Sequence, residues 1–194
     1  MRYVIVGLII AGMLPAAATV TASATAAADD GLRVATFSVD ITPPLGQPVG
    51  LGFIPILNTA EHPLLARGIL LQDAGVSCVV CTLDWMEVHS ESYDFLRQSI
   101  GEAAGVPASQ VALQSLHQHT APAISTAAQR LQLEETDPRR VASAEYLLDV
   151  SKKIAAAVRK SQENWQAVTS IHTGKAKVER VASNRRLERA DGSI

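Results

Sequence analysis

Aromatic residues make up only 4% of this 194-residue sequence, and it contains no block of lysine and arginine residues. Proteins that bind nucleic acids present such blocks to the phosphates, or aromatic side chains to the bases. The chain has 17 basic and 19 acidic residues, for a formal net charge of -2. We therefore expect no nucleic acid partner, and no anionic surface that attracts the chain by charge.

Cysteine is also scarce, and the two residues, Cys78 and Cys81, lie in one apolar run. If that run is a strand, residues three apart point to opposite faces and their Cα atoms lie about 10 Å apart, beyond the reach of a disulfide. A zinc or redox Cys-x-x-Cys motif requires a turn or a helix start, which the apolar neighbours do not provide. We therefore expect two free, buried thiols.

Residues 1–28 have the pattern of a secretory signal peptide. Arg2 supplies positive charge, residues 4–14 are apolar, and the small residues at 22–28 offer cleavage sites. The alternative is an uncleaved N-terminal membrane anchor, because residues 3–20 are nearly uncharged. We therefore expect a secreted or periplasmic protein, or one anchored at its N-terminus, whose domain begins at residue 29.

The remaining residues, 29–194, predict one α/β domain with a mixed sheet and flanking helices. Strands are predicted at residues 32–41, 63–72 and 76–83, the last two joined by a hairpin at Asp73-Ala74-Gly75. The third strand is apolar on both faces and should be central in the sheet. A strand or hairpin is also predicted at 168–178, where His172 is expected to be an ordinary surface or packed histidine.

Two helices are predicted from apolar residues at helical spacing. The first begins at an N-cap, Ser90, and ends at Gly105. The second follows a loop that extends to Thr136, and Asp137-Pro138 caps it. The residues that form the buried stripes are Tyr93, Leu96, Ile100 and Ala103 in the first helix and Leu147, Val150, Ile154 and Val158 in the second.

The stretch that carries most chemical information is the His-x-His pair, His117 and His119, after an apolar run at 111–116. Alternate residues of an extended chain face the same side, so the two imidazoles are expected to converge where this strand ends. Sheets of α/β proteins bind ligands at that edge, and imidazole is a common zinc ligand. The pair is a candidate metal site, and the alternative is a solvated strand end or a hydrogen-bonded histidine pair.

Asp84 follows the strand predicted at 76–83 and occupies the same kind of position as His117. It is expected either to share the crevice with the histidines or to cap a loop. His62 and His89 are expected, like His172, to be ordinary surface or packed histidines.

Six short segments form an ordered set of motifs. They are Asp-Ile-Thr-Pro at 40–43, Gly-Leu-Gly-Phe at 50–53, Leu-Ala-Arg-Gly-Ile-Leu at 65–70, Leu-Asp at 83–84, His-Gln-His-Thr-Ala-Pro at 117–122 and Asn-Arg at 184–185. In this order they resemble the start of the catalytic domain in the neutral/alkaline, non-lysosomal ceramidase family. The most specific is the segment at 117–122, which is similar to the family's His-Thr-His-Ser-Gly-Pro. The resemblance covers residues 34–187.

The resemblance implies part of the catalytic domain of a layered α/β hydrolase that depends on Zn²⁺. It implies hydrolysis of the N-acyl amide of ceramide-like lipids to a fatty acid and a sphingoid base, with peripheral contact between protein and membrane lipid. His117 is then a zinc ligand, and His119 and Arg185 bind the substrate. The other zinc ligands and the nucleophilic serine are expected downstream, so the chain is expected to be truncated at Ile194 and inactive alone.

The sequence departs from the family at Gln118, Thr120-Ala121 and Arg186-Leu187, so the substrate is expected to differ in part. Two other functions remain open. One is an unrelated His-x-His metallohydrolase with a barrel fold, although the predicted hairpin counts against alternating strands and helices. The other is an exported lipid-binding module without catalytic activity, or a degenerate fragment.

Overall fold

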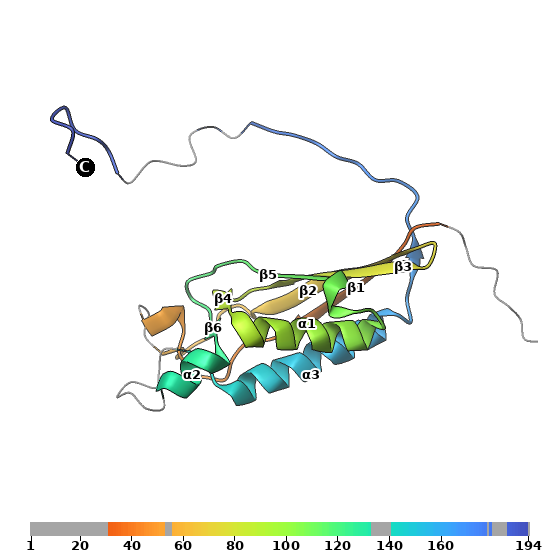
Figure 1. The fold of residues 1–194 in the computed structure, drawn as a ribbon, viewed down its shortest axis with the longest axis horizontal. Coiled ribbons are helices and arrows are strands. Elements are labelled where there is room, and N and C mark those ends of the chain that lie inside the picture. Colours follow the sequence, from red (N-terminus) through yellow and green to blue (C-terminus); the bar gives the residue numbers. More distant parts are fainter. Residues whose placement is uncertain (1–30, 53–55, 133–140, 178, 180–185, 194) are drawn as a thin grey trace, which may run out of the picture.

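A five-stranded mixed sheet forms the centre of the computed structural model, which describes residues 31–52, 56–132, 141–177, 179 and 186–193 (Figure 1). The order of strands is β5-β3-β2-β1-β7. Only β3 and β5 pair in parallel, and the other neighbours are antiparallel. The bounds are Arg33–Asp40 for β1, Leu65–Asp73 for β2, Val76–Leu83 for β3, Val111–Ser115 for β5 and Gln166–Ala167 for β7. The predicted α/β class with a mixed sheet is confirmed.

Strands β2 and β3 form the predicted hairpin, in which Asp73 pairs with Val76. The two residues of the turn, Ala74 and Gly75, have φ values of 41° and 82°. A two-residue turn with positive φ at both positions matches the right-handed twist of the strands that it joins. Because β1, β2 and β3 are successive antiparallel strands, the sheet differs from the parallel sheet of a metallohydrolase barrel.

Helices α1 (Ser90–Ala104) and α3 (Ala144–Ser161) pack side by side against one face of the sheet (Figure 1). Alternate residues of each strand point to that face, and the strand register aligns them in rows. One row crosses four strands through Ala35, Leu70, Val79 and Val111, all of which are at most 3% exposed. The core therefore lies between the sheet and these two helices.

Strand β3 lies in the interior of the sheet, between β5 and β2, as predicted, but it is fully buried on one face only. Val79 and Cys81 point to the helices, whereas Val80 is 39% exposed on the opposite face. The apolar sequence of residues 76–83 therefore predicted the interior position of the strand correctly, but the prediction that both of its faces are apolar and buried was wrong.

Helix α1 ends as predicted at Gly105, whose φ of 74° allows its N–H to donate to the carbonyl of Gly101. Its start differs by one residue. His89 occupies the N-cap position and makes no side-chain cap, and Ser90 is the first helical residue. The buried face of the helix is as expected for Leu96, Ile100 and Ala103, and Tyr93 packs against its edge.

Helix α3 begins at Ala144, later than the sequence predicted, and Ser143 accepts a hydrogen bond from the N–H of Tyr146 as its cap. The predicted cap, Asp137-Pro138, lies outside the described residues. The predicted stripe of Leu147, Val150, Ile154 and Val158 is buried throughout. A short helix, α2 (Thr126–Gln132), and the paired strands β4 (Glu87–Val88) and β6 (Ala123–Ile124) occupy segments that were expected to be irregular.

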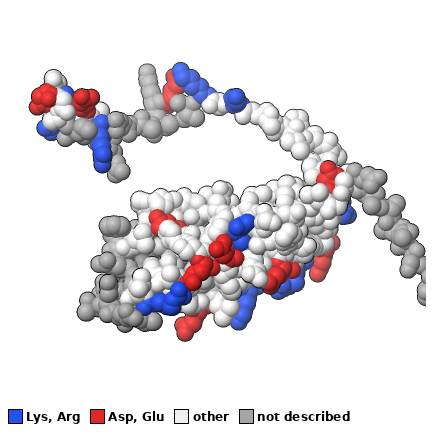
Figure 2. Space-filling model, viewed as in Figure 1, with Lys and Arg blue, Asp and Glu red and all other residues white. Residues whose placement is uncertain are grey.

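The strand or hairpin predicted at 168–178 is wrong, because β7 ends at Ala167 and residues 168–177 have no regular structure. His172 is exposed there and contacts the Ser170 hydroxyl, in agreement with the surface position expected for it. Residues 1–30 and Arg185 lie outside the described residues. Among the described residues, no helix has the length and apolar character needed to cross a bilayer. Basic and acidic side chains are interspersed over the helices on the face shown in Figure 2.

Both cysteines are free thiols on opposite faces of β3, as predicted, with Cys81 fully buried and Cys78 partly so. Burial raises the pKa of Cys81 from 9.0 to about 12. Above pH 9 the unfolded chain releases this proton and the folded chain keeps it, so the free energy of unfolding falls as pH rises.

Between pH 8 and pH 10, Cys81 is expected to lower the free energy of unfolding by about 1.4 kcal/mol. Urea unfolding at both pH values measures this. The loss should shrink by that amount in Cys81→Ala and remain in the matched control Cys78→Ala. An equal loss in both variants would show that Cys81 is accessible in the folded state.

Candidate metal-binding site

His117 lies just beyond the carboxyl end of β5, beside the end of the parallel strand β3. The N–H of Leu116 donates to the carbonyl of Leu83 at 3.1 Å, and the N–H of His117 donates to the carbonyl of Trp85, also at 3.1 Å. These bonds continue the pairing past the last strand residue. The backbone of His117 is therefore held by hydrogen bonds at the carboxyl ends of β3 and β5. This is the edge of the sheet at which α/β proteins bind ligands.

The backbone of His117 has a φ of 61°, in the left-handed region. This conformation costs a residue with a Cβ about 1–2 kcal/mol, and glycine would avoid that cost. Residues in this conformation cluster at functional sites. Leu51, Ala74 and Ser90 also have positive φ values, so the conformation of His117 supports a functional role only together with its neighbours.

The rings of His117 and His119 lie next to each other, with centroids 5.3 Å apart and planes at 81°. The sequence predicted this proximity from an extended chain, but the strand ends at Ser115 and the left-handed turn at His117 intervenes. The side chain of His117 is 58% exposed. The two rings are thus adjacent, as predicted, for a different backbone reason, and the pair faces solvent.

One nitrogen of the His117 ring is committed to the backbone. Nδ1 lies 3.2 Å from the carbonyl oxygen of Met86, which can only accept a hydrogen bond. We therefore assign the proton of the neutral ring to Nδ1, which leaves the lone pair on Nε2 for a ligand. Histidines that bind metals characteristically donate their other N–H to a carbonyl or a carboxylate in this way, so the arrangement of His117 is that expected of a single metal ligand.

The carboxylate of Glu87, a residue that the sequence analysis did not select, lies beside His117 and also contacts His89. Oε1 of Glu87 lies 3.7 Å from Nδ1 of His117, and Oε2 of the same carboxylate lies 2.5 Å from Nε2 of His89. Both residues belong to the segment around β4, where alternate positions place Glu87 and His89 within reach of each other. Residues two apart in an extended segment face the same side, which is why the sequence analysis selected His117 and His119. The same reasoning applied to Glu87 and His89 would have placed these two side chains next to each other.

Asp84 does not join the histidines. It is 5% exposed, and its carboxylate accepts hydrogen bonds from the N–H of Leu65 at 2.9 Å and from Arg67 at 3.3 Å. Both partners belong to the start of β2. Of the two roles that the sequence left open, the loop-capping one is the one observed.

The buried side chains behind the site are Trp85 and Tyr146. Nε1 of Trp85 donates to the hydroxyl of Tyr146 at 3.0 Å, and this hydroxyl donates to the carbonyl of Ile41. Burial raises the pKa of Tyr146 above its usual value, so the phenol remains protonated and can donate. Trp85 thereby connects the backbone of His117 to the core.

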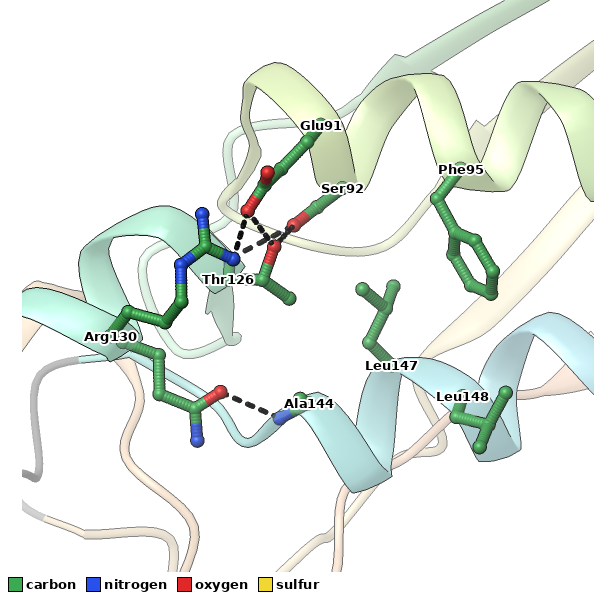
Figure 3. Close-up of a pocket in the computed structure, with 9 residues that line it drawn as sticks. Glu91, Ser92, Phe95, Thr126, Arg130, Ala144, Leu147 and Leu148 are labelled. Atoms are coloured by element: carbon green, nitrogen blue, oxygen red, sulfur yellow. Dashed lines mark hydrogen bonds and ion pairs between the residues drawn. The ribbon is translucent and has the colours of Figure 1, made fainter. Parts of the chain in front are cut away.

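Two cavities lie near this end of the sheet. One, of about 340 Å³, is lined by the loop that contains His62 and by Thr120, the residue after His119. The other, of about 520 Å³, lies between α1, α2 and α3 and combines apolar Phe95 and Leu148 with the Glu91–Arg130 pair (Figure 3). Only the first cavity includes a residue adjacent to the histidine pair.

Zinc in a catalytic site requires about three protein ligands. The described residues include no group of three or more His, Cys, Asp or Glu side chains arranged to hold a metal ion. The assignments of His117 as a zinc ligand and of His119 as a substrate-binding group remain predictions, as does that of Arg185.

No protein-family model matches the sequence, and no curated protein sequence matches it. The structure does match solved structures. A neutral ceramidase from Pseudomonas aeruginosa matches with a TM-score of 0.55 and 16% sequence identity, and a ceramidase complexed with C2 matches with a TM-score of 0.52 and 17% identity.

Each match covers 72% of this chain and 22% of the ceramidase chain, so the sequence spans less than a quarter of the length of these proteins. At this level of identity the similarity concerns the fold alone. The chain therefore has, over most of its length, a fold similar to that of one part of a neutral ceramidase.

Proposed function

We propose that this chain is the N-terminal part of the catalytic domain of a zinc-dependent amidohydrolase of the neutral ceramidase type. The proposed reaction cleaves the N-acyl amide of a ceramide-like lipid to a fatty acid and a sphingoid base. The observation that supports it most is His117, held at a strand end in a strained conformation with Nδ1 bound to a carbonyl, in a ceramidase-like fold.

In this proposal His117 binds zinc through Nε2, and His119, whose ring is adjacent, contacts the substrate. Arg185, which lies outside the described residues, contributes a second substrate contact. Two further zinc ligands and the nucleophile must come from residues other than the described ones, because no group of three ligands is present among those.

Bound zinc would polarise the amide carbonyl and lower the pKa of a hydroxyl group next to it. The described residues of this chain orient the proposed zinc ligand. The carbonyl of Met86 keeps the proton of the His117 ring on Nδ1, and the backbone bond to Trp85 fixes where the ring stands. A histidine fixed in this way does not need to reorganise when the site is loaded.

The substrate proposed is a membrane lipid, so peripheral contact with a lipid surface follows from the same proposal. Export through the predicted signal peptide, to the periplasm or the exterior, is consistent with a lipid substrate in that compartment.

The test uses the protein as its source organism produces it, purified and assayed for zinc content and for hydrolysis of a fluorescent ceramide. His117→Ala is expected to lower zinc affinity by more than about 100-fold, the upper range for loss of a supporting residue, and to abolish hydrolysis. The matched control is His172→Ala, because His172 is exposed and its ring contacts the hydroxyl of Ser170, away from the candidate site. Zinc content equal to that of the unmodified protein would contradict the assignment.

A lipid-binding module without catalysis is the second candidate. The 58% exposure of the His117 side chain and the lack of a third ligand among the described residues favour it. Binding of ceramide-containing vesicles without zinc and without amide hydrolysis would support this function over the first.

A further inference from the structure

We infer that Glu87 is a positioning residue for His117, and that His89 holds the Glu87 carboxylate in place. The inference rests on the proposed function, because it concerns how the candidate zinc ligand is oriented. It goes beyond that function by naming two residues outside the His-x-His motif.

The geometry shows one carboxylate between two imidazoles. Oε2 of Glu87 lies 2.5 Å from Nε2 of His89, and Oε1 lies 3.7 Å from Nδ1 of His117. An ionised carboxylate only accepts hydrogen bonds, so Nε2 of His89 donates the proton. The second oxygen then places negative charge beside the Nδ1–H of His117 and stabilises the same tautomer that the Met86 carbonyl selects.

The backbone on both sides of Glu87 is fixed by the segment that follows the histidine pair. The N–H of Met86 donates to the carbonyl of Pro122, and the N–H of His89 donates to that of Ile124, both at 3.0 Å. Between them, β4 pairs with β6 through Glu87 and Ala123. The backbone that bears the Glu87 carboxylate is therefore tied to the segment that directly follows the histidine pair in the chain.

The side chain of Glu87 is 26% exposed, so water screens its charge only in part. A carboxylate in this position influences a bound metal ion only indirectly, through the imidazole ring of His117. We expect it to fix the tautomer and orientation of His117 and to raise the affinity of Nε2 for a metal ion.

The primary test is the tautomer of His117, measured on the 194-residue chain without metal by ¹⁵N-imidazole NMR. The Nδ1–H form is expected to dominate. Glu87→Gln should lower its fraction, although the Met86 carbonyl retains part of the preference, and Glu87→Asp should restore part of the loss. The matched control is Glu91→Gln, because Glu91 contacts Thr126 and Arg130 and no imidazole. An unchanged tautomer in Glu87→Gln would overturn the inference.

The second test is titration with Zn²⁺ of the same variants in the protein as its source organism produces it, because the described residues hold no group of three zinc ligands. Loss of a group that orients a metal-binding histidine typically costs 10–100-fold in affinity, so we expect about that loss for Glu87→Gln and a smaller one for His89→Ala. A chain that binds no zinc but shows the tautomer change contradicts the proposed metal role and leaves the positioning role intact. Zinc affinity that is equal in the unmodified chain and Glu87→Gln contradicts the positioning role.

Discussion

Replacement of Trp85 by alanine is expected to lower the free energy of unfolding by about 3–5 kcal/mol, the usual cost of deleting a buried aromatic side chain. Trp85 is 0% exposed, and its ring lies 5.8 Å from that of Tyr146. The substitution leaves a cavity and removes the donor that the Tyr146 hydroxyl accepts. Because small domains have about 5–15 kcal/mol of stability in total, this is a large fraction.

Urea unfolding followed by far-UV circular dichroism measures the loss in Trp85→Ala. The matched control is Trp85→Phe, which keeps most of the packing and removes the N–H group, and it should cost about 1–3 kcal/mol. Because the carbonyl of Trp85 fixes the N–H of His117, the NMR signals of His117 should also shift in Trp85→Ala. A loss below about 1.5 kcal/mol in Trp85→Ala would show that the ring is not part of the core.

The substitution Gly68→Ala is expected to be comparably destabilising, by about 3 kcal/mol, for the opposite reason of overpacking. Gly68 pairs with Phe37 across β1 and β2, and a Cβ placed there would lie 2.3 Å from the phenyl ring and 2.6 Å from the backbone oxygen of Val80. The phenyl ring can move, but the backbone oxygen of Val80 cannot move freely, because it belongs to β3, which is paired with a strand on each side. The sheet must therefore deform.

Two variants test this explanation of Gly68. In Gly174→Ala, where nothing lies within 4 Å of the added Cβ, the free energy of unfolding should change by less than about 0.5 kcal/mol. The double variant Phe37→Leu/Gly68→Ala should be more stable than the sum of the two single changes predicts, because the residues are in contact. Strict additivity would show that the Phe37 ring does not limit the space at position 68.

Local periodicity predicted the elements whose apolar pattern was unambiguous. Two apolar runs around Asp73-Ala74-Gly75 predicted the β2–β3 hairpin. Apolar residues at helical spacing predicted the buried face of α3, which consists of Leu147, Val150, Ile154 and Val158. The same reasoning failed at 168–178, where alternation occurs without a neighbouring strand to pair with. It also placed the start of α3 too early, because Asp-Pro is a good cap in any helix and Ser143 is the one used here.

The sequence by itself determined the α/β class, the free cysteines on opposite faces of a strand, and the position of His117 at the end of a strand. Each depends on residues that are close in the chain, where the strand and helix periods decide which side chains share a face. Only the tertiary structure decided that Asp84 caps the start of β2, and that the Glu87 carboxylate lies beside His117. These contacts join residues that are far apart in sequence. They depend on the pairing of β4 with β6 and on hydrogen bonds beyond the ends of β3 and β5, which no local pattern specifies.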